Sequence, residues 1–161
     1  MVNYQKMAVK LATVIAIALI SFVWILPVQA IEQNFELKSD RGYRLETSLA
    51  YRQTQNNKIS AQGKGKTEVI DFLQVRFYNP DGKMIASYDN IVGGTVQSEY
   101  FEFNYDPNTQ ELIGNVDLGG ESAGDVFLKG NMQEGLSLIE VESTGVEKVV
   151  NSGKWTTAKT N

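Results

Sequence analysis

The sequence predicts an all-β protein, and three observations support this fold class. After position 30, apolar and polar residues alternate or form β-rich runs, and Gly, Asn and Asp recur between these runs. In this part no stretch of about ten or more residues has the 3.6-residue period of an amphipathic helix. Many short strands spaced by roughly 8–12 residues are typical of an antiparallel barrel or sandwich.

The predicted strands follow one another along the chain, and each ends where turn residues interrupt the pattern. Residues 67–78 are rich in Val, Ile, Phe and Tyr, whereas the later runs VFLKG, LSLIEV and VEKVV are short and lie between the turns NMQEG and STG. Pro80 and Pro107 both fall in turns, where proline is tolerated. The predicted strands are 34–38, 43–53, 57–62, 67–78, 83–92, 95–105, 111–118, 124–130, 136–143 and 146–155.

An antiparallel meander of about 8–10 short strands fits two architectures. One is a small barrel, similar in size to the lipocalins, and we favour it because a closed barrel has no exposed strand edges. The alternative is a two-sheet β-sandwich, which the strand count fits about as well.

The hairpin EYFEFNY-DPNTQ-ELIGNV has a register that its turn predicts. A four-residue loop at 107–110 sets Tyr105 opposite Leu112, and the same register continues to Phe101 opposite Val116. One face of this strand pair is then apolar and the other polar, as expected for an antiparallel pair with one solvated side.

The N-terminal segment predicts where the protein goes. Two lysines precede the apolar residues 11–26, Pro27 ends this run, and small residues lead up to Ala30. This order is typical of a secretory signal peptide, so we expect residues 1–30 to be a helical signal that is cleaved after Ala30. Residues 31–161 would then be a single all-β domain in the bacterial periplasm or outside the cell. An uncleaved N-terminal membrane anchor is the alternative, because the apolar run is close to the roughly 17-residue lower limit of a spanning helix.

Composition excludes several chemistries. The chain has no His and no Cys, which removes Ser-His-Asp and Cys-His catalysis and the usual zinc, copper and haem sites. The part after position 30 has 19 Asp and Glu against 13 Lys and Arg, a net charge of −6. Such a domain has no electrostatic attraction to nucleic acid or to anionic lipid. We therefore expect no enzyme activity, no cofactor, no nucleic-acid partner and no membrane contact after signal cleavage.

Aromatic residues supply the candidate binding site, because their faces stack on ligands and tyrosine hydroxyls orient them. We expect Phe101, Phe103 and Tyr105 to be ordinary core residues. Tyr100 shares the polar face of its strand with Glu102, and an exposed tyrosine beside a carboxylate suits a binding surface. The candidate binding residues are Tyr78, Tyr88, Tyr100, Glu102 and Trp155.

Two acidic groupings are further candidates for a site. Asp106, Asn108 and Glu111 offer oxygen ligands for calcium, but Asp-Pro-Asn is also a favourable turn sequence, and we predict no metal site. A glycosidase-like carboxylate pair could come from four residues, namely Asp89, Glu99, Glu102 and Asp117.

These observations favour a non-enzymatic, exported binding module for an apolar small ligand or an envelope protein. The alternative is an envelope structural or assembly protein that self-associates through strand edges. A carboxylate-based hydrolase is the third hypothesis. The sequence leaves the oligomeric state open.

Overall fold

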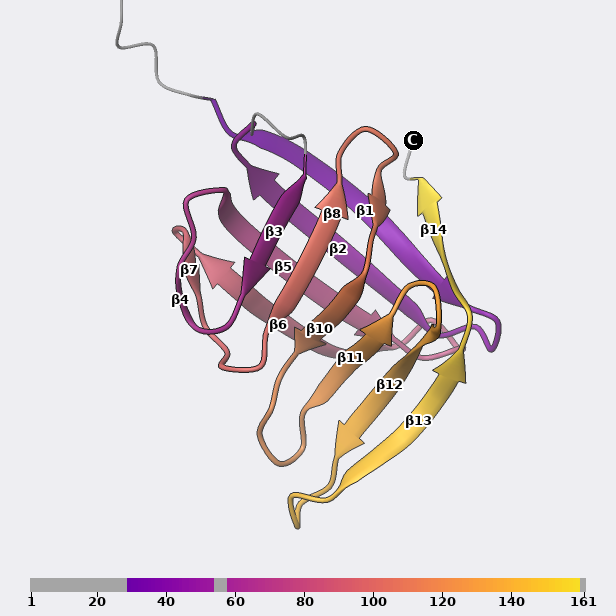
Figure 1. The fold of residues 1–161 in the computed structure, drawn as a ribbon. Coiled ribbons are helices and arrows are strands. Elements are labelled where there is room, and N and C mark those ends of the chain that lie inside the picture. Colours follow the sequence, from indigo (N-terminus) through magenta and orange to yellow (C-terminus); the bar gives the residue numbers. More distant parts are fainter. Residues whose placement is uncertain (1–28, 54–57, 160–161) are drawn as a thin grey trace, which may run out of the picture.

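The computed structural model describes residues 29–53 and 58–159, and in this part the chain is all-β without a helix. Its strands form two antiparallel sheets, which are stacked as two layers (Figure 1). The predicted all-β class is therefore confirmed. The segment predicted as a signal peptide lies almost entirely outside the described residues. Within the described residues, no helix has the length and apolar character needed to cross a membrane.

Sheet A contains the N-terminal and C-terminal strands side by side. From edge to edge its seven strands are β14 (Trp155–Lys159), β1 (Ile31–Ser39), β2 (Arg44–Tyr51), β5 (Ile70–Tyr78), β6 (Met84–Val92), β7 (Thr95–Val96) and β4 (Gly65–Lys66). Alternation is clear on β2, where every second residue from Leu45 to Tyr51 is buried. This face packs against the other sheet.

Sheet B contains the middle and later strands. From edge to edge these are β13 (Glu147–Gly153), β12 (Gly135–Val141), β11 (Val126–Asn131), β10 (Asn115–Gly119), β8 (Glu102–Asp106) and β3 (Ile59–Gln62), and β9 (Glu111–Leu112) also pairs with β8. On β11 three successive residues, Val126, Phe127 and Leu128, are all buried. Apolar side chains are therefore covered on both faces of this strand.

The chain passes directly from one sheet to the other at two places. Gly63 and Lys64 connect β3 to β4, and Lys154 alone separates β13 from β14. The described strands form two separate hydrogen-bonded sheets and not a closed barrel. Three predicted strands are corrected, because each contains an interruption. The predicted strand 146–155 is divided into β13 and β14, 95–105 is divided into β7 and β8, and 111–118 is divided into β9 and β10.

An aromatic stack fills part of the space between the sheets. Phe101, Phe103 and Tyr105 are at most 1 % exposed, which confirms their prediction as core residues. The rings of Phe103 and Tyr105 are stacked with centroids 6.1 Å apart. Phe35 of β1 stacks on Tyr105 at 5.2 Å, so the stack joins the two sheets.

The predicted hairpin register holds at the turn and changes further along. Tyr105 pairs with Leu112, as predicted. Beyond this point Asp117 pairs with Glu102, so the predicted pairing of Phe101 with Val116 is wrong. A break between β9 and β10 shifts the register by two positions on β8. Because this shift is even, Asp117 and Glu102 remain on the same, outward face.

Candidate binding site

A second apolar cluster lies on sheet B, separate from the core between the sheets. It consists of Phe127 on β11 and of Ile139 and Val141 on β12, with exposed fractions of 6 %, 8 % and 6 %. Phe127 and Ile139 are direct cross-strand partners. The neighbours Val126 and Leu128 belong to the core instead, so Phe127 faces outward by strand alternation. We call Phe127, Ile139 and Val141 the outer cluster.

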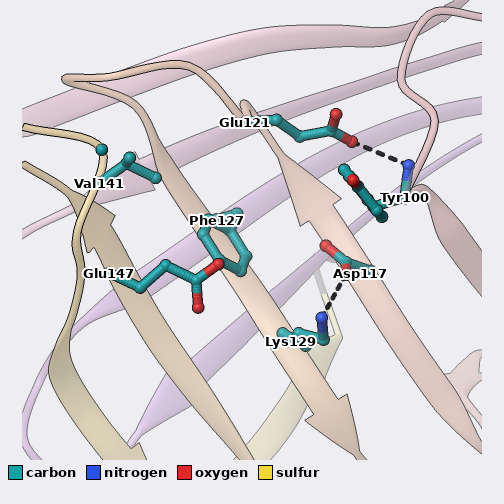
Figure 2. Close-up of a pocket in the computed structure, with 8 residues that line it drawn as sticks. Tyr100, Asp117, Glu121, Phe127, Lys129, Val141 and Glu147 are labelled. Carbon is teal, nitrogen blue, oxygen red and sulfur yellow. Dashed lines mark hydrogen bonds and ion pairs between the residues drawn. The ribbon is translucent and has the colours of Figure 1, made fainter.

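A pocket of about 330 Å³ lies beside the outer cluster. This volume is at the lower end of the ~300–1,000 Å³ range of small-molecule sites. Phe127 and Val141 supply apolar lining, and charged side chains surround them (Figure 2). The lining residues are Tyr100, Asp117, Glu121, Phe127, Lys129, Val141, Gly145 and Glu147.

Tyr100 forms one wall of the pocket and is the most exposed large apolar residue there. Its side chain is 71 % exposed, and its backbone N–H donates a hydrogen bond of 2.9 Å to the Glu121 carboxylate (Figure 2). This bond attaches the chain just before β8 to the loop after β10. The backbone of Tyr100 is thus anchored beside the pocket, and its side chain remains largely exposed to solvent.

Apolar surface continues from the pocket towards the edge of sheet B. Val149 of β13 is the cross-strand partner of Ile139 and is 57 % exposed. Val146, in the turn before β13, is 59 % exposed. Val149 therefore extends the apolar surface of the outer cluster towards the sheet edge.

Asp117 is the central charged group of the site. Its side chain is only 13 % exposed, and Lys129 lies 3.5 Å away with 57 % exposure. Burial raises the pKa of the Asp117 carboxyl to about 6, and the nearby charge of Lys129 opposes this shift. The carboxylates of Glu121 and Glu102 raise this pKa further. Asp117 is therefore a partly desolvated carboxylate with incomplete charge compensation.

Of the four carboxylates predicted as possible catalytic partners, the fold brings Glu102 and Asp117 together as direct cross-strand neighbours. Asp89 instead accepts a hydrogen bond from Gln74 on sheet A. Glu99 lies 3.7 Å from Lys64, and both side chains are largely exposed. Paired carboxylates on one outward face can attract a cation strongly.

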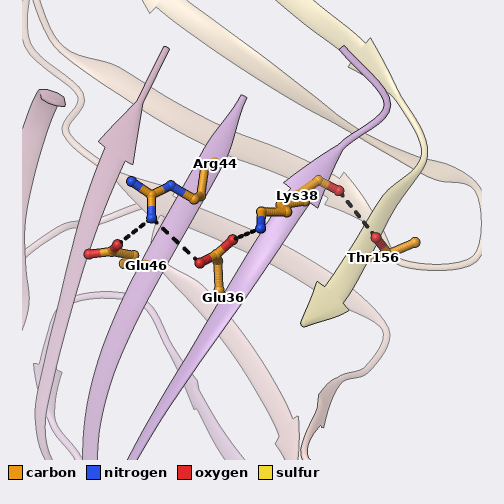
Figure 3. Close-up of polar contacts among 5 residues, drawn as sticks. All are labelled: Glu36, Lys38, Arg44, Glu46 and Thr156. Carbon is orange, nitrogen blue, oxygen red and sulfur yellow. Dashed lines mark hydrogen bonds and ion pairs between the residues drawn. The ribbon is translucent and has the colours of Figure 1, made fainter. Parts of the chain in front are cut away.

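The charged group on the outer face of sheet A is balanced, unlike the charges around the pocket. Arg44 lies 2.7 Å from Glu46 and 3.5 Å from Glu36, and Lys38 lies 2.9 Å from Glu36 (Figure 3). Two cations and two carboxylates therefore compensate one another on neighbouring strands. Tyr78 completes this group, because its hydroxyl donates to Glu46 at 2.8 Å and Arg44 stacks on its ring at 4.2 Å.

The structure distributes the predicted binding residues over three places. Tyr100 lines the pocket, and Glu102 lies next to it beside Asp117. Tyr78 lies on the outer face of sheet A, on a different sheet from the pocket. Tyr88 and Trp155 lie in the third place, the core between the sheets: Trp155 belongs to it and Tyr88 packs against it.

Tyr88 and Trp155 both use their polar groups inside the fold. The Tyr88 hydroxyl accepts a 2.9 Å hydrogen bond from the Val126 N–H and donates to Asp125 at 3.2 Å. Trp155 is 4 % exposed, and its indole N–H donates to the carbonyl of Leu136 at 3.2 Å. Both side chains connect strands of sheet A to strands of sheet B.

Residues 106–111, the candidate calcium site in the sequence, contain a turn. The Asp106 carboxylate accepts a 2.9 Å hydrogen bond from the backbone N–H of Asn108, and the Asp106 carbonyl accepts one from Gln110. Among the described residues, acidic side chains do not gather in groups of three that could hold a metal ion.

Of the lining residues, sequence reasoning identified Tyr100 and Asp117 and missed the others, namely Glu121, Phe127, Lys129, Val141, Gly145 and Glu147. The run VFL contained a usable signal, because three successive apolar residues in a strand place at least one of them on the solvated face. The partner of that residue, Ile139, sits in the similar run LIEV. Apolar residues in the outward phase of two neighbouring strands predict an apolar patch on the outer face.

No family model, curated protein or solved structure matches this chain. The site is therefore interpreted from its own geometry.

Proposed function

We propose that the protein is an exported, non-enzymatic binding module that holds an apolar group of its ligand in the pocket of sheet B. The observation that carries this proposal is the outer cluster, which lies against a pocket of about 330 Å³ with the exposed ring of Tyr100 at its wall. A solvated face normally carries polar residues. Three nearly buried apolar side chains there, continued by exposed valines, support a binding surface.

The ligand in this proposal binds outside the two sheets and not between them. Side chains such as the aromatic stack of Phe35, Phe103 and Tyr105 occupy the space between the inner faces. A filled interior supports a two-sheet sandwich over a ligand-carrying barrel of the lipocalin type. The binding surface is then an outer sheet face, bordered by the loop after β10.

Export is the second part of the proposal. The basic, apolar and small-residue order of residues 1–30 supports a secretory signal cleaved after Ala30. The absence of Cys from the chain agrees with a fold that relies on packing in any redox environment. The intact mass of the purified protein will report the cleavage position.

A neutral aromatic probe tests the pocket. The full 161-residue chain is expressed with its export route intact, labelled with ¹⁵N and titrated with 2-phenylethanol by NMR. We expect amide shifts to concentrate at Tyr100, Phe127, Val141 and Gly145. Tyr100→Ala should reduce the affinity for 2-phenylethanol about fivefold, because an aromatic contact contributes ~1 kcal/mol of binding free energy.

Met84→Ala is the matched control for this experiment. Met84 is 52 % exposed and lies on sheet A, so its removal takes away an exposed apolar side chain from the sheet that does not carry the pocket. It should leave the affinity unchanged. Shifts that map to sheet A, or equal effects of the two substitutions, would overturn the proposal.

A second candidate function is assembly through the edge of sheet B, and the exposure of β13 favours it. β13 pairs only with β12 among the described strands, and Val146 and Val149 are exposed beside it. Glu147 and Lys148 place charges on the same strand, a common protection against edge pairing. Sedimentation over a wide concentration range separates the two functions, since assembly requires a mass that increases with concentration.

A further inference from the structure

The charges around the pocket indicate which chemical class of ligand it takes, an inference that rests on the proposed function. The lining contains three carboxylates, Asp117, Glu121 and Glu147, and a single cation, Lys129. Glu102 adds a fourth carboxylate as the cross-strand partner of Asp117. The immediate surroundings of the apolar lining are therefore net negative, and they favour a positively charged ligand group.

Lys129 compensates this charge only in part. Its side chain is 57 % exposed and 3.5 Å from the Asp117 carboxylate, whose side chain is 13 % exposed. An ion pair with one largely solvated partner is weak, because water and salt screen it. A ligand cation placed in the pocket would lie near Asp117, whose side chain is only 13 % exposed, and charges attract more strongly where water is partly excluded.

The aromatic and apolar groups of the pocket complete the recognition of such a ligand. The exposed ring of Tyr100 offers a face to a cation within the same pocket as the carboxylates. Phe127 and Val141 offer apolar contact to the remainder of the molecule. A cation and an apolar group must therefore occur close together in one ligand.

We propose that the pocket binds an organic ammonium ion, that is, a protonated amine joined to a small aromatic or aliphatic group. The amine lies against Asp117 and the face of Tyr100, and its apolar part rests on Phe127 and Val141. A pocket of about 330 Å³ suits a molecule of this size. A second copy of this chain, docking by the same face, is disfavoured because it would bring two acidic patches together.

Three probes with one skeleton test the charge. 2-Phenylethylamine is protonated at pH 7.5, 2-phenylethanol is neutral, and 3-phenylpropionate is an anion. We expect the amine to bind at least about tenfold more tightly than the alcohol, because one partly buried ion pair contributes ~1.5 kcal/mol or more. The anion should not bind measurably. An increase from 50 to 500 mM NaCl should reduce the preference for the amine, by screening.

Substitutions connect the preference to the pocket. Asp117→Asn should reduce the preference of amine over alcohol to below about threefold, while the alcohol keeps its affinity. Asp89→Asn is the matched control, because it removes one carboxylate from sheet A, and it should leave the preference unchanged.

The preference should also depend on pH. The groups that face Asp117 are Lys129 on β11, Glu102 on β8, and Glu121 and Tyr100 from the adjoining loops. Burial raises the pKa of Asp117 to about 6, so its charge is lost as the pH falls through this value. The amine should therefore bind more weakly at pH 5 than at pH 7.5, whereas the alcohol should not change.

The outcomes distinguish the two proposals. Equal affinity for amine and alcohol, with shifts at Phe127 and Val141, would overturn ammonium recognition and leave the apolar pocket intact. An amine that shifts the acidic residues but not Phe127 or Val141 would be a mere counter-ion, which also overturns ammonium recognition. Absence of shifts in the pocket with all three probes would overturn both proposals.

Discussion

Asp117 is the residue at which binding and stability oppose each other. Its carboxyl is buried beside an apolar pocket, and its pKa rises to about 6 in the folded protein. The ionised form is thus less favourable in the folded state than in the unfolded state, where the pKa has its ordinary value of 3.8. At neutral pH Asp117 lowers the stability of the fold, a cost that is common at functional sites.

Asp117→Asn should raise the free energy of unfolding by roughly 2 kcal/mol at pH 7.5. Between about pH 4 and pH 6 the folded state binds the Asp117 proton and the unfolded state does not. The wild-type protein therefore recovers stability relative to the variant as the pH falls through about 6. Urea denaturation at pH 7.5, 6.0 and 4.5 measures this difference, which should shrink towards zero at the lowest pH.

Asp89→Asn again serves as the control for this experiment, because it removes one negative charge from the other sheet. If the free energies of unfolding of Asp117→Asn and the wild type differed by the same amount at all three pH values, the raised pKa of Asp117 would not be the cause. A less stable Asp117→Asn variant at pH 7.5 would contradict the sign.

At the scale of the element, the junction of β10 and β11 fixes the position of Phe127. A Cβ added to Gly119 would lie 2.3 Å from the Val126 carbonyl oxygen and 2.7 Å from the Phe127 Cα, and the φ of Gly119 is +133°. The Gly119 carbonyl also accepts a 2.8 Å hydrogen bond from the side chain of Asn90 on sheet A. The two strands approach closely here because Gly119 has no side chain.

Gly119→Ala should lower the free energy of unfolding by about 2–4 kcal/mol, through backbone strain together with the clash against β11. Gly65→Ala is the matched control, since its φ is also +133° and a Cβ there meets nothing within 4 Å. This control should lower stability by only ~1 kcal/mol. Urea denaturation of both variants separates the clash from the strain, and equal effects would exclude the clash.

Alternation in the sequence predicted the strand content and the core role of Phe101, Phe103 and Tyr105, because burial on one face follows a period of two. Where the chain changes sheets was not predictable in this way. The predicted strand 95–105 contains no Gly or Pro, yet the chain leaves sheet A after β7 and enters sheet B at β8. Partner strands from distant parts of the chain decide this change, and a local pattern does not contain them.

The candidate site was predictable in part for a similar reason. Tyr100 and Glu102 were identified because an aromatic and an acid occur together in the polar phase of one strand. Phe127 and Val141 belong to strands whose outward phase is also apolar, so alternation alone does not assign their faces. Their pocket depends on the order of β10, β11, β12 and β13 within the sheet.

At the scale of the whole molecule, β14 holds the two sheets together. It pairs with β1 along five residue pairs, from Phe35 with Lys159 to Ser39 with Trp155. Trp155 also donates a hydrogen bond to Leu136 in sheet B. This strand therefore forms one edge of sheet A and anchors it to the opposite layer.

A chain that ends after Lys154 should fail to form a stable fold. It would expose the edge of β1 and remove the buried Trp155, whose loss alone is expected to cost about 3–5 kcal/mol. Circular dichroism and size-exclusion chromatography should show a disordered or aggregated product. Trp155→Phe is the comparison variant, because it retains β14 and loses the indole N–H. It should fold with reduced stability, and a native-like truncated chain would contradict the role given to β14.

The pairing of the first and last described strands has a consequence for how the protein is made. The Thr156 hydroxyl donates to the Lys38 carbonyl across 118 positions of the chain. β14 is synthesised long after β1, so during much of translation β1 lacks the neighbour that closes one side of its ladder. Contacts between such distant segments form late and slowly. The growing chain therefore cannot complete sheet A until β14 has also been synthesised.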